Sequence, residues 1–246
     1  MAPVTAESEG AAARESQVRS MFDRIAGRYD LLNSVMSAGL HHRWRTRAVD
    51  IAGVASGDRA LDVCCGTGDL ALELKRTVGE QGRVVGLDFS EPMLELARSK
   101  SSRLGLDVEF VQGNALELPF ADHAFDAATV GFGVRNLVDL RSGIAELARV
   151  VRPGARVVIL EITTPTDPPL SWFYRLWFDA AVPLLGAVAG DRDAYTYLPE
   201  SVRRFPPPLE LAELMHQVGL RSIRYLLLAG GIVAIHSGTL QEEGPL

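Results

Sequence analysis

The sequence is poor in cysteine and has no long apolar run. Its 246 residues include two cysteines, Cys64 and Cys65. Adjacent cysteines do not readily pair with each other or form a zinc site, so we interpret both as small packing residues in a reducing compartment and expect no metal. The net charge of −6 provides no basic surface of the kind that nucleic acids select, so we expect no nucleic-acid partner.

Membrane and export signals are also missing. No apolar stretch approaches the roughly 20 residues that cross a bilayer, and no basic start followed by an apolar core marks a signal peptide. We therefore expect a cytoplasmic protein whose contact with the inner face of the cell membrane is at most peripheral. The sequence makes no prediction of oligomeric state.

Beyond the first fifty residues, apolar segments of strand length alternate with helical patterns. This alternation predicts an α/β fold, in which a doubly wound, mostly parallel sheet binds ligands at the carboxyl ends of its strands. Two later apolar segments are joined by Ala229-Gly230-Gly231 and predict an antiparallel closing pair. The expected strands are 59–63, 83–88, 107–112, 125–130, 156–161, 222–228 and 231–237, and the expected helices between them are 69–79, 90–104, 139–151 and 209–218.

The segments that flank this alternation predict additions to the sheet. Apolar residues at helical spacing predict two helices, at 15–30 and about 41–51, in an N-terminal part that covers 14–55. Proline-rich and aromatic stretches at 163–208 interrupt the alternation and predict an insertion over one end of the sheet. We expect one domain over 14–240, a disordered tail at 1–13 and a short tail at 241–246.

The most informative segment joins the strand that ends near Asp62 to the helix that begins at Asp69, through Gly66-Thr67-Gly68. Asp88 follows twenty residues after Gly68 and ends the next apolar run, where a carboxylate can accept hydrogen bonds from both hydroxyls of a ribose. Acids on both sides of the glycines favour a cationic ligand by Coulomb attraction.

The cofactor predicted from this loop is S-adenosylmethionine, which carries a sulfonium and an ammonium group. A dinucleotide would place a pyrophosphate at the helix N-terminus instead. Gly66-x-Gly68-x-x-Ala71 also fits a relaxed dinucleotide pattern, so the loop alone leaves that alternative open. Short-chain dehydrogenases need a tyrosine four residues before a lysine, and this chain has Ala71 and Leu96 before its two lysines.

Two further segments follow expected strands. Asn114 and the backbone N–H of Ala115 lie in a small polar turn after the third strand, and we expect them at the edge of the adenine. The fourth strand ends in Gly131-Phe132-Gly133, and a helix turns into the fifth strand near Pro153-Gly154. Together with the loop, these ordered segments resemble the class I S-adenosylmethionine-dependent methyltransferases over residues 58–238. That resemblance implies a seven-stranded sheet with an antiparallel last strand.

A closer resemblance covers about 18–238, nearly the whole chain, and includes segments outside the cofactor fold. Its motifs are Tyr29-Asp-Leu-Leu-Asn-Ser-Val-Met-Ser37 with His41 and Trp44, Gly66-Thr-Gly-Asp69, Phe132-Gly-Val-Arg-Asn136, Arg149-Val-Val-Arg-Pro-Gly154 and Asp193-Ala-Tyr-Thr-Tyr-Leu-Pro-Glu-Ser201. These are similar to the ubiquinone/menaquinone biosynthesis C-methyltransferases. Departures from the family pattern are Leu32, Cys64-Cys65, Gly131 and Arg152; Gly131 puts one cofactor hydrogen bond in doubt.

The resemblance implies methyl transfer from S-adenosylmethionine to a ring carbon of a prenyl quinol, a small lipid substrate. Demethylmenaquinol is the favoured acceptor; the alternatives are 2-methoxy-6-polyprenyl-1,4-benzoquinol, another lipophilic phenol, or a non-catalytic role as an assembly partner. We expect Arg135 and Asn136 to stabilise charge on the quinol oxygen, with a water or Asp193 accepting the proton. Tyr29, His41 and Tyr197 are expected to line the ring pocket.

The aromatic run at 170–185 contains two of the three tryptophans. A core helix is the ordinary interpretation of such a run. The substrate class favours a helix that covers an isoprenoid tail, and partial insertion at a membrane interface is a third interpretation.

Overall fold

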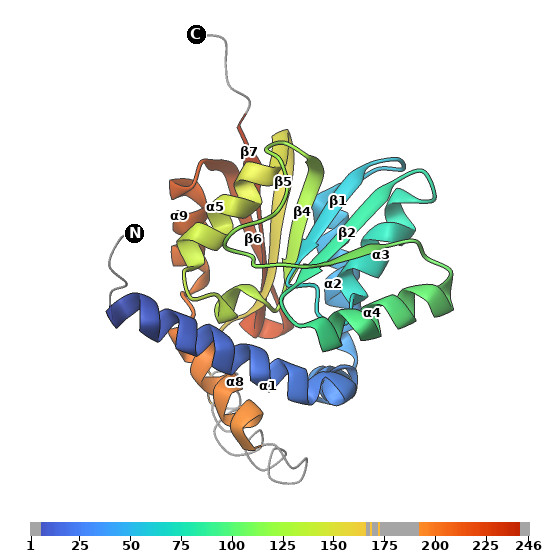
Figure 1. Ribbon diagram of the computed structural model, residues 1–246. Helices are drawn as coiled ribbons and strands as arrows, with labels where there is room; N and C mark the ends of the chain where they lie inside the picture. Colours follow the sequence, from blue (N-terminus) through green and yellow to red (C-terminus); the bar gives the residue numbers. More distant parts are fainter. Residues whose placement is uncertain (1–5, 166–167, 169–171, 173–191, 242–246) are drawn as a thin grey trace.

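In the computed structural model, residues 6–165, 168, 172 and 192–241 are described, and they form a seven-stranded sheet flanked by helices (Figure 1). The strand order is β3-β2-β1-β4-β5-β7-β6. Every neighbouring pair is parallel except the two pairs that contain β7, so the predicted doubly wound sheet with an antiparallel last strand is confirmed. The strands are β1 Arg59–Val63, β2 Arg83–Asp88, β3 Glu109–Gln112, β4 Phe125–Gly131, β5 Val151–Ile162, β6 Leu220–Leu228 and β7 Val233–Leu240.

Two apolar layers hold helices against opposite faces of this sheet. On one face, α5 (Leu140–Val150) packs on β4 and β5 and α9 (Pro208–Gln217) on β6 and β7, and Ile144 and Leu211 belong to the same buried layer. On the other, α2 (Leu40–Ala52), α3 (Asp69–Val78) and α4 (Glu91–Leu104) form the second layer, with Leu74 completely buried. Both faces of the central strands are therefore covered, which explains their continuous apolar runs in the sequence.

The largest differences from the expected boundaries are in helix α1 and strand β5. Helix α1 spans Ala6–Ser37, so residues 6–13, expected in the tail, are helical. That segment is rich in alanine and glutamate, which have high helix propensity, and it continues a helix already started by the apolar residues after it. Strand β5 begins at Val151 rather than 156, because Val151 pairs with Phe125 ahead of an irregularity in the register.

The carboxyl ends of four parallel strands meet at one edge of the sheet. Val63 of β1 lies between Leu87 of β2 and Val130 of β4, while Gly131 pairs with Leu160 of β5. The chain leaves β1 toward β2 on one side, and β4 lies on the other, so the strand order reverses between β1 and β4. Open α/β sheets bind their ligands at such a reversal.

Helix α1 lies across this edge of the sheet, and α8 (Arg192–Arg204) lies beside it (Figure 1). Helix α8 belongs to the expected insertion at 163–208 and also contacts the short helix η1 (Val134–Asn136) that follows β4. Most of the aromatic run at 170–185 lies outside the described residues. Within the part of the chain that the structure describes, no helix combines the length and apolar character needed to cross a bilayer.

Candidate functional site

A pocket with about 740 Å³ of empty space, open to solvent, lies at the carboxyl ends of β1, β2 and β4. Helix α1 closes one side of it with Val18, Phe22 and Tyr29. The opposite wall is formed by the loops that follow the strands. The lining residues from those loops and the adjoining helices are Cys64, Gly66, Leu87, Asp88, Phe89, Met93, Gly113, Asn114, Ala115, Leu116, Phe132, Gly133, Asn136, Leu137 and Val138.

The glycine loop is folded tightly onto the neighbouring strand and helix. The N–H of Cys65 donates to the carbonyl of Leu87 (3.0 Å), and that of Gly68 donates to the carbonyl of Cys65 (2.9 Å). Gly68 has φ +82°, and a Cβ there would lie 3.0 Å from the side chains of Ala97 and Phe110. Only glycine meets both the backbone conformation and the close approach of α4 without strain.

Two non-glycine residues that line the pocket are held in the left-handed region. Cys64, at the end of β1, has φ 54°, and Phe132, at the end of β4, has φ 60°. Such conformations cost about 1–3 kcal/mol each and concentrate at functional sites. Cys64 belongs to the apolar layer under α5, whereas Cys65 belongs to the layer under α3. Both thiols are free, they pack against opposite faces of the sheet, and burial raises both pKa values.

Asp88 is the acid that the structure places most directly in the pocket. It is 5% exposed; its Oδ2 accepts from the N–H of Gly66 (2.8 Å) and its Oδ1 accepts from the N–H of Ser90 (2.9 Å). Burial raises the pKa of Asp88 to about 6, although both N–H groups stabilise the carboxylate. The carboxylate therefore has fixed geometry and is ionised at neutral pH, as the ribose-binding role expected of it requires.

Asp62 is buried at the end of β1 and does not line the pocket itself. Its Oδ1 accepts from the hydroxyl of Thr129 (2.8 Å), while its Oδ2 has no hydrogen-bond partner among the described residues. Burial raises the pKa of Asp62 to about 7. A buried acceptor without a partner is costly, and it fits a site completed by a cationic ligand or a water that the ligand holds.

Thr67 and Asp69 face away from the pocket and toward the N-terminal helices. Lys100 of α4 donates to Thr67 Oγ1 (3.1 Å) and pairs with Asp69 (2.5 Å) and with Asp30 of α1 (2.8 Å). The Thr67 hydroxyl in turn donates to Asp30 Oδ1 (2.6 Å), and Arg45 of α2 pairs with Asp69 (3.3 Å). We call Asp30, Thr67, Asp69 and Lys100 the α1 clamp, because they fasten helix α1 to the glycine loop.

The contacts of the α1 clamp show that Asp69 does not attract a cationic ligand as expected. Asp69 was expected to attract a cationic ligand, but Lys100 and Arg45 compensate its charge. Burial raises the pKa of Asp69, yet these two cations outweigh the burial and leave it lowered. The negative charge in the pocket lining comes from Asp88, whereas Asp62 is buried outside the lining with its pKa raised to about 7.

His41, expected in the ring pocket, lies outside the pocket lining. Arg45 Nη1 donates to its Nδ1, so its Nε2 carries the proton and donates to Ser34 Oγ (3.1 Å). Burial and the charge of Arg45 lower the pKa of His41 to about 4. His41 is thus a neutral, buried link between α1 and α2, because the turn between the two helices directs it inward.

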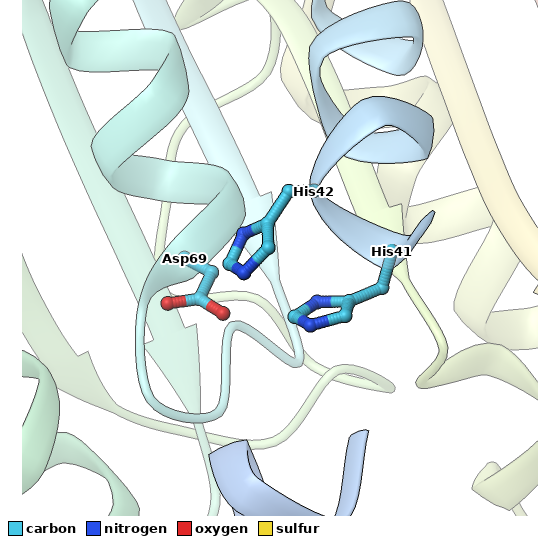
Figure 2. A group of neighbouring side chains, drawn as sticks. All are labelled: His41, His42 and Asp69. Carbon is cyan, nitrogen blue, oxygen red and sulfur yellow. The ribbon is translucent and has the colours of Figure 1, made fainter. Parts of the chain in front are cut away.

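His41, His42 and Asp69 lie close enough to resemble a metal site, with one ligand atom from each within 4.8 Å of the others. Figure 2 shows the Asp69 carboxylate pointing toward both imidazole rings. Arg45 donates to His41 and pairs with Asp69, and Lys100 also pairs with Asp69. Because two cationic side chains already use these ligand atoms, we interpret the group as an ion-pair network.

The expected adenine side of the pocket is formed by the turn after β3. Asn114 and Ala115 both line the pocket, together with Phe89 and Met93. Asn114 Oδ1 accepts from the N–H of Leu116 (2.9 Å), which fixes the turn and leaves the amide nitrogen of the side chain as a donor. Apolar walls with a few fixed polar groups are typical of a nucleoside site.

Arg135 is buried beside the pocket, not in its lining. Its Nη1 pairs with Glu161 Oε1 of β5 (2.6 Å) and donates to the carbonyl of Phe132 (2.6 Å), and its backbone N–H donates to Glu161 Oε2 (3.3 Å). The two side chains are 8% and 1% exposed. The Arg135–Glu161 pair therefore fixes helix η1 on the end of β5, and burial raises the pKa of Glu161.

Asn136, Tyr29 and Tyr197 gather where η1, α1 and α8 meet. Asn136 and Tyr29 line the pocket, and the hydroxyl of Tyr197 donates to Asn136 Oδ1 (3.0 Å). Arg135 acts electrostatically on both tyrosines. Asp193 lies on α8, but its side chain is outside the described part of the structure.

Several residues at this site had no assigned role in the sequence analysis. Glu161 carries a detectable signal, an acid that directly follows the apolar run of β5, in a strand that a parallel sheet buries on both faces. Lys100 and Asp30 carry none, because their contacts join helices that are about seventy residues apart in the chain. Phe89 and Met93 look like ordinary core residues in the sequence.

We predict that the affinity for S-adenosylmethionine rises as the pH increases from about 5 to 7, because ionisation of Asp88 favours the ribose hydrogen bonds. Protonation below the Asp88 pKa of about 6 opposes binding. Asp88→Asn should weaken binding at pH 7.5 by roughly 10- to 100-fold, the loss expected for charged hydrogen bonds. It should also flatten the dependence of affinity on pH, and the pH dependence that remains would come from Asp62, whose pKa is raised to about 7.

Titration calorimetry at several pH values measures both effects. Asp122→Asn is the matched control, since this carboxylate is 65% exposed and pairs with Arg149 away from the pocket. Equal pH profiles for the Asp88→Asn variant and the wild type would contradict the assignment.

We predict that Lys100→Met weakens cofactor binding by about tenfold, because it leaves Asp30 and Asp69 without their shared cation and loosens α1. Lys100→Arg keeps the charge and should retain most of the affinity. The dissociation rate of the cofactor, measured by stopped-flow fluorescence, should rise in the Met variant. An unchanged rate would mean that the α1 clamp does not limit cofactor exchange.

Similar solved structures reproduce this fold at low sequence identity. A S-adenosylmethionine-dependent methyltransferase from Aquifex aeolicus aligns with a TM-score of 0.60 at 22% identity, covering 80% of this chain and 89% of that one. The [4+2]-cyclase SpnF aligns with a TM-score of 0.66 at 19% identity, covering 92% and 95%. One neighbour is named as a methyltransferase and the other as a cyclase, so the shared architecture does not define the reaction.

Curated relatives match at much higher identity. A demethylmenaquinone methyltransferase from Thermus thermophilus is 49% identical over 89% of this chain and 99% of its own length, and one from Desulfitobacterium hafniense is 47% identical over 92% and 90%. A ubiquinone/menaquinone biosynthesis C-methyltransferase from Hahella chejuensis is 41% identical over 92% of both chains.

The family model described as "ubiE/COQ5 methyltransferase family" matches residues 11–240, which include α1, the pocket and α8. This match confirms the enzyme class and the methyl donor predicted from the glycine loop. The chain belongs to the ubiE/COQ5 methyltransferase family, whose members use S-adenosylmethionine.

Proposed function

We propose that this protein transfers a methyl group from S-adenosylmethionine to a ring carbon of demethylmenaquinol. One observation carries the proposal: the similarity to demethylmenaquinone methyltransferases extends beyond the cofactor fold to α1 and α8. These two helices supply Tyr29 and Tyr197 around Asn136, and both Tyr29 and Asn136 line the pocket. An acceptor that lies between helices α1, α8 and η1 would meet both phenols and the amide.

The residues at the strand ends would hold the cofactor. Asp88 would accept hydrogen bonds from the ribose hydroxyls, Ala115 and Asn114 would offer donors to the adenine, and Phe89 and Met93 would supply apolar contacts. Bound S-adenosylmethionine supplies an electrophilic methyl group on a positively charged sulfur. Asp62 is buried at the end of β1 with an Oδ2 that has no partner among the described residues, and a cationic group bound nearby would favour its ionised form.

The residues around η1 would prepare the quinol. A ring carbon becomes nucleophilic when the neighbouring hydroxyl is deprotonated; it then forms the new C–C bond as the methyl–sulfur bond breaks, and afterwards loses its hydrogen as a proton. Arg135, paired with Glu161 behind the pocket, would position helix η1 and with it Asn136, and its charge favours the ionised form of Tyr29. We assign proton transfer to a water held by Asn136, with Asp193 of α8 as the alternative acceptor.

The other functions considered for the sequence make distinct demands. A 2-methoxy-6-polyprenyl-1,4-benzoquinol or another lipophilic phenol would use the same cofactor site with a different ring. A non-catalytic assembly partner would bind the cofactor without turnover.

The proposed acceptor carries a long prenyl tail that resides in bilayers, so a cytoplasmic location with peripheral contact at the inner face of the membrane is part of this proposal.

The activity assay uses methyl-labelled S-adenosylmethionine and compares reduced demethylmenaquinone with the benzoquinol and with simple phenols. We expect labelled menaquinol as the main product, with kcat/KM at least about tenfold higher for demethylmenaquinol, since discrimination between rings of different substituents is worth about 1–3 kcal/mol. Preferential transfer to the benzoquinol would show that the benzoquinol, not demethylmenaquinol, is the acceptor. Cofactor binding without transfer to any acceptor would favour the assembly role.

The role of Arg135 is tested with its partner neutralised, because Arg135→Ala alone leaves Glu161 buried and unpaired, at a cost of about 3–5 kcal/mol. In the double variant Arg135→Met/Glu161→Gln, we expect kcat to fall by about 100-fold, since a shift of about 1 Å in a positioned group such as Asn136 can cost that much. The cofactor dissociation constant should change little.

Arg83→Met/Glu109→Gln is the control, because it removes an ion pair of similar length (2.5 Å) that lies outside the pocket, with both side chains about half exposed. Circular dichroism checks that all variants are folded. A folded double variant that no longer binds S-adenosylmethionine would contradict the division of roles between Asp88 and Arg135.

A further inference from the structure

An exposed apolar surface lies at the corner where α1 ends and α2 begins. Leu31, Val35 and Leu40 are 65%, 56% and 40% exposed. Leu31 and Val35 are four residues apart and share one face of α1. The hydrogen bond between His41 and Ser34 folds the start of α2 back onto the end of α1, so Leu40 joins the same corner. Single exposed apolar side chains are ordinary, but three within ten residues at one corner mark a binding surface.

Basic residues surround this corner. Residues 28–47 contain four arginines and one acidic residue in a chain whose net charge is −6; of these arginines, Arg45 is buried and pairs with Asp69. Arg28 lies one turn before Leu31 on the same face of α1, and Arg43 and Arg47 share a face of α2 with Leu40. All three arginines are exposed. Asp50, which pairs with Arg47, lies about 15 Å along α2 from Leu40, at 1.5 Å per residue.

The apolar centre and basic rim of this corner together determine which kind of partner it can bind. A second copy of the chain would bring the same positive surface against itself in a symmetric dimer, which is unfavourable. A nucleic acid would use the arginines but leave the three apolar side chains without a partner. An anionic bilayer satisfies both, because apolar side chains enter the interface and arginines meet the lipid phosphates.

We propose that the corner of α1 and α2, centred on Leu31, Val35 and Leu40, binds the surface of an anionic lipid bilayer. The opposite face of the same helix lines the pocket with Val18, Phe22 and Tyr29. Contact at this corner therefore holds the pocket one helix diameter, about 10 Å, from the bilayer. The bilayer contact would assist catalysis only if the proposed function is correct, because a prenyl quinol could then reach the pocket directly from the membrane. This corner is a different segment from the aromatic run at 170–185, for which insertion at a membrane interface was the third interpretation.

The test is co-sedimentation of the full-length protein with vesicles of phosphatidylcholine alone and of phosphatidylcholine mixed with phosphatidylglycerol. We expect binding to the anionic vesicles, weakened by salt. The double variant Leu31→Ser/Val35→Ser should lower that binding by roughly tenfold or more, because it removes the apolar side chains that insert. Arg43→Gln should lower it by about fivefold and leave binding to neutral vesicles unchanged.

Leu209→Ser is the matched control, since Leu209 is 71% exposed on α9, a helix that packs on β6 and β7. This variant should bind anionic vesicles like the wild type. Failure of the wild type to bind, or equal binding by Leu31→Ser/Val35→Ser, would overturn the proposal. So would light scattering that shows a dimer lost in the same double variant.

Vesicle binding needs no turnover, so the result is independent of the proposed reaction. Methyl transfer to a water-soluble quinol without the long tail should be unchanged in Leu31→Ser/Val35→Ser, because neither residue lines the pocket. Lack of transfer in every variant would reject the proposed reaction and leave the bilayer contact standing.

Discussion

A buried carboxylate at the end of β2 organises the pocket of this protein. Asp88 holds the glycine loop through the N–H of Gly66 and the start of α4 through the N–H of Ser90. Its two oxygens thus tie together the elements that follow β1 and β2. The carboxylate is buried at some energetic cost, visible in its raised pKa, and its acceptor geometry is set before a ligand arrives.

Helix α1 turns this open sheet edge into a pocket. It is fastened at two points, by Asp23 to the Ser90 hydroxyl (2.5 Å) and by Asp30 to Thr67 and Lys100. One face of the helix closes over the cofactor site while the other presents apolar side chains and arginines outward. A single element therefore connects cofactor retention with the surface that we assign to the bilayer, so movement of α1 would affect both.

Local patterns in the sequence predicted the sheet, most helix boundaries and the strand-end residues Gly66, Asp88, Asn114, Ala115 and Asn136, all of which line the pocket. These residues lie together because each follows its own strand, and parallel strands bring their carboxyl ends to one edge. The patterns failed for His41, because adjacent residues at the start of a helix look alike until the preceding turn decides which one faces inward.

The sequence by itself determined the fold, the cofactor loop and the family, since these follow from periodicity, glycine placement and motif spacing. Only the tertiary structure decided which charges remain available to a ligand. Asp69 and Asp88 are both acids beside the same loop, yet Lys100 and Arg45 compensate the first and not the second. Those partners come from distant parts of the chain, and Coulomb interactions depend on distances in space that the order of residues does not contain.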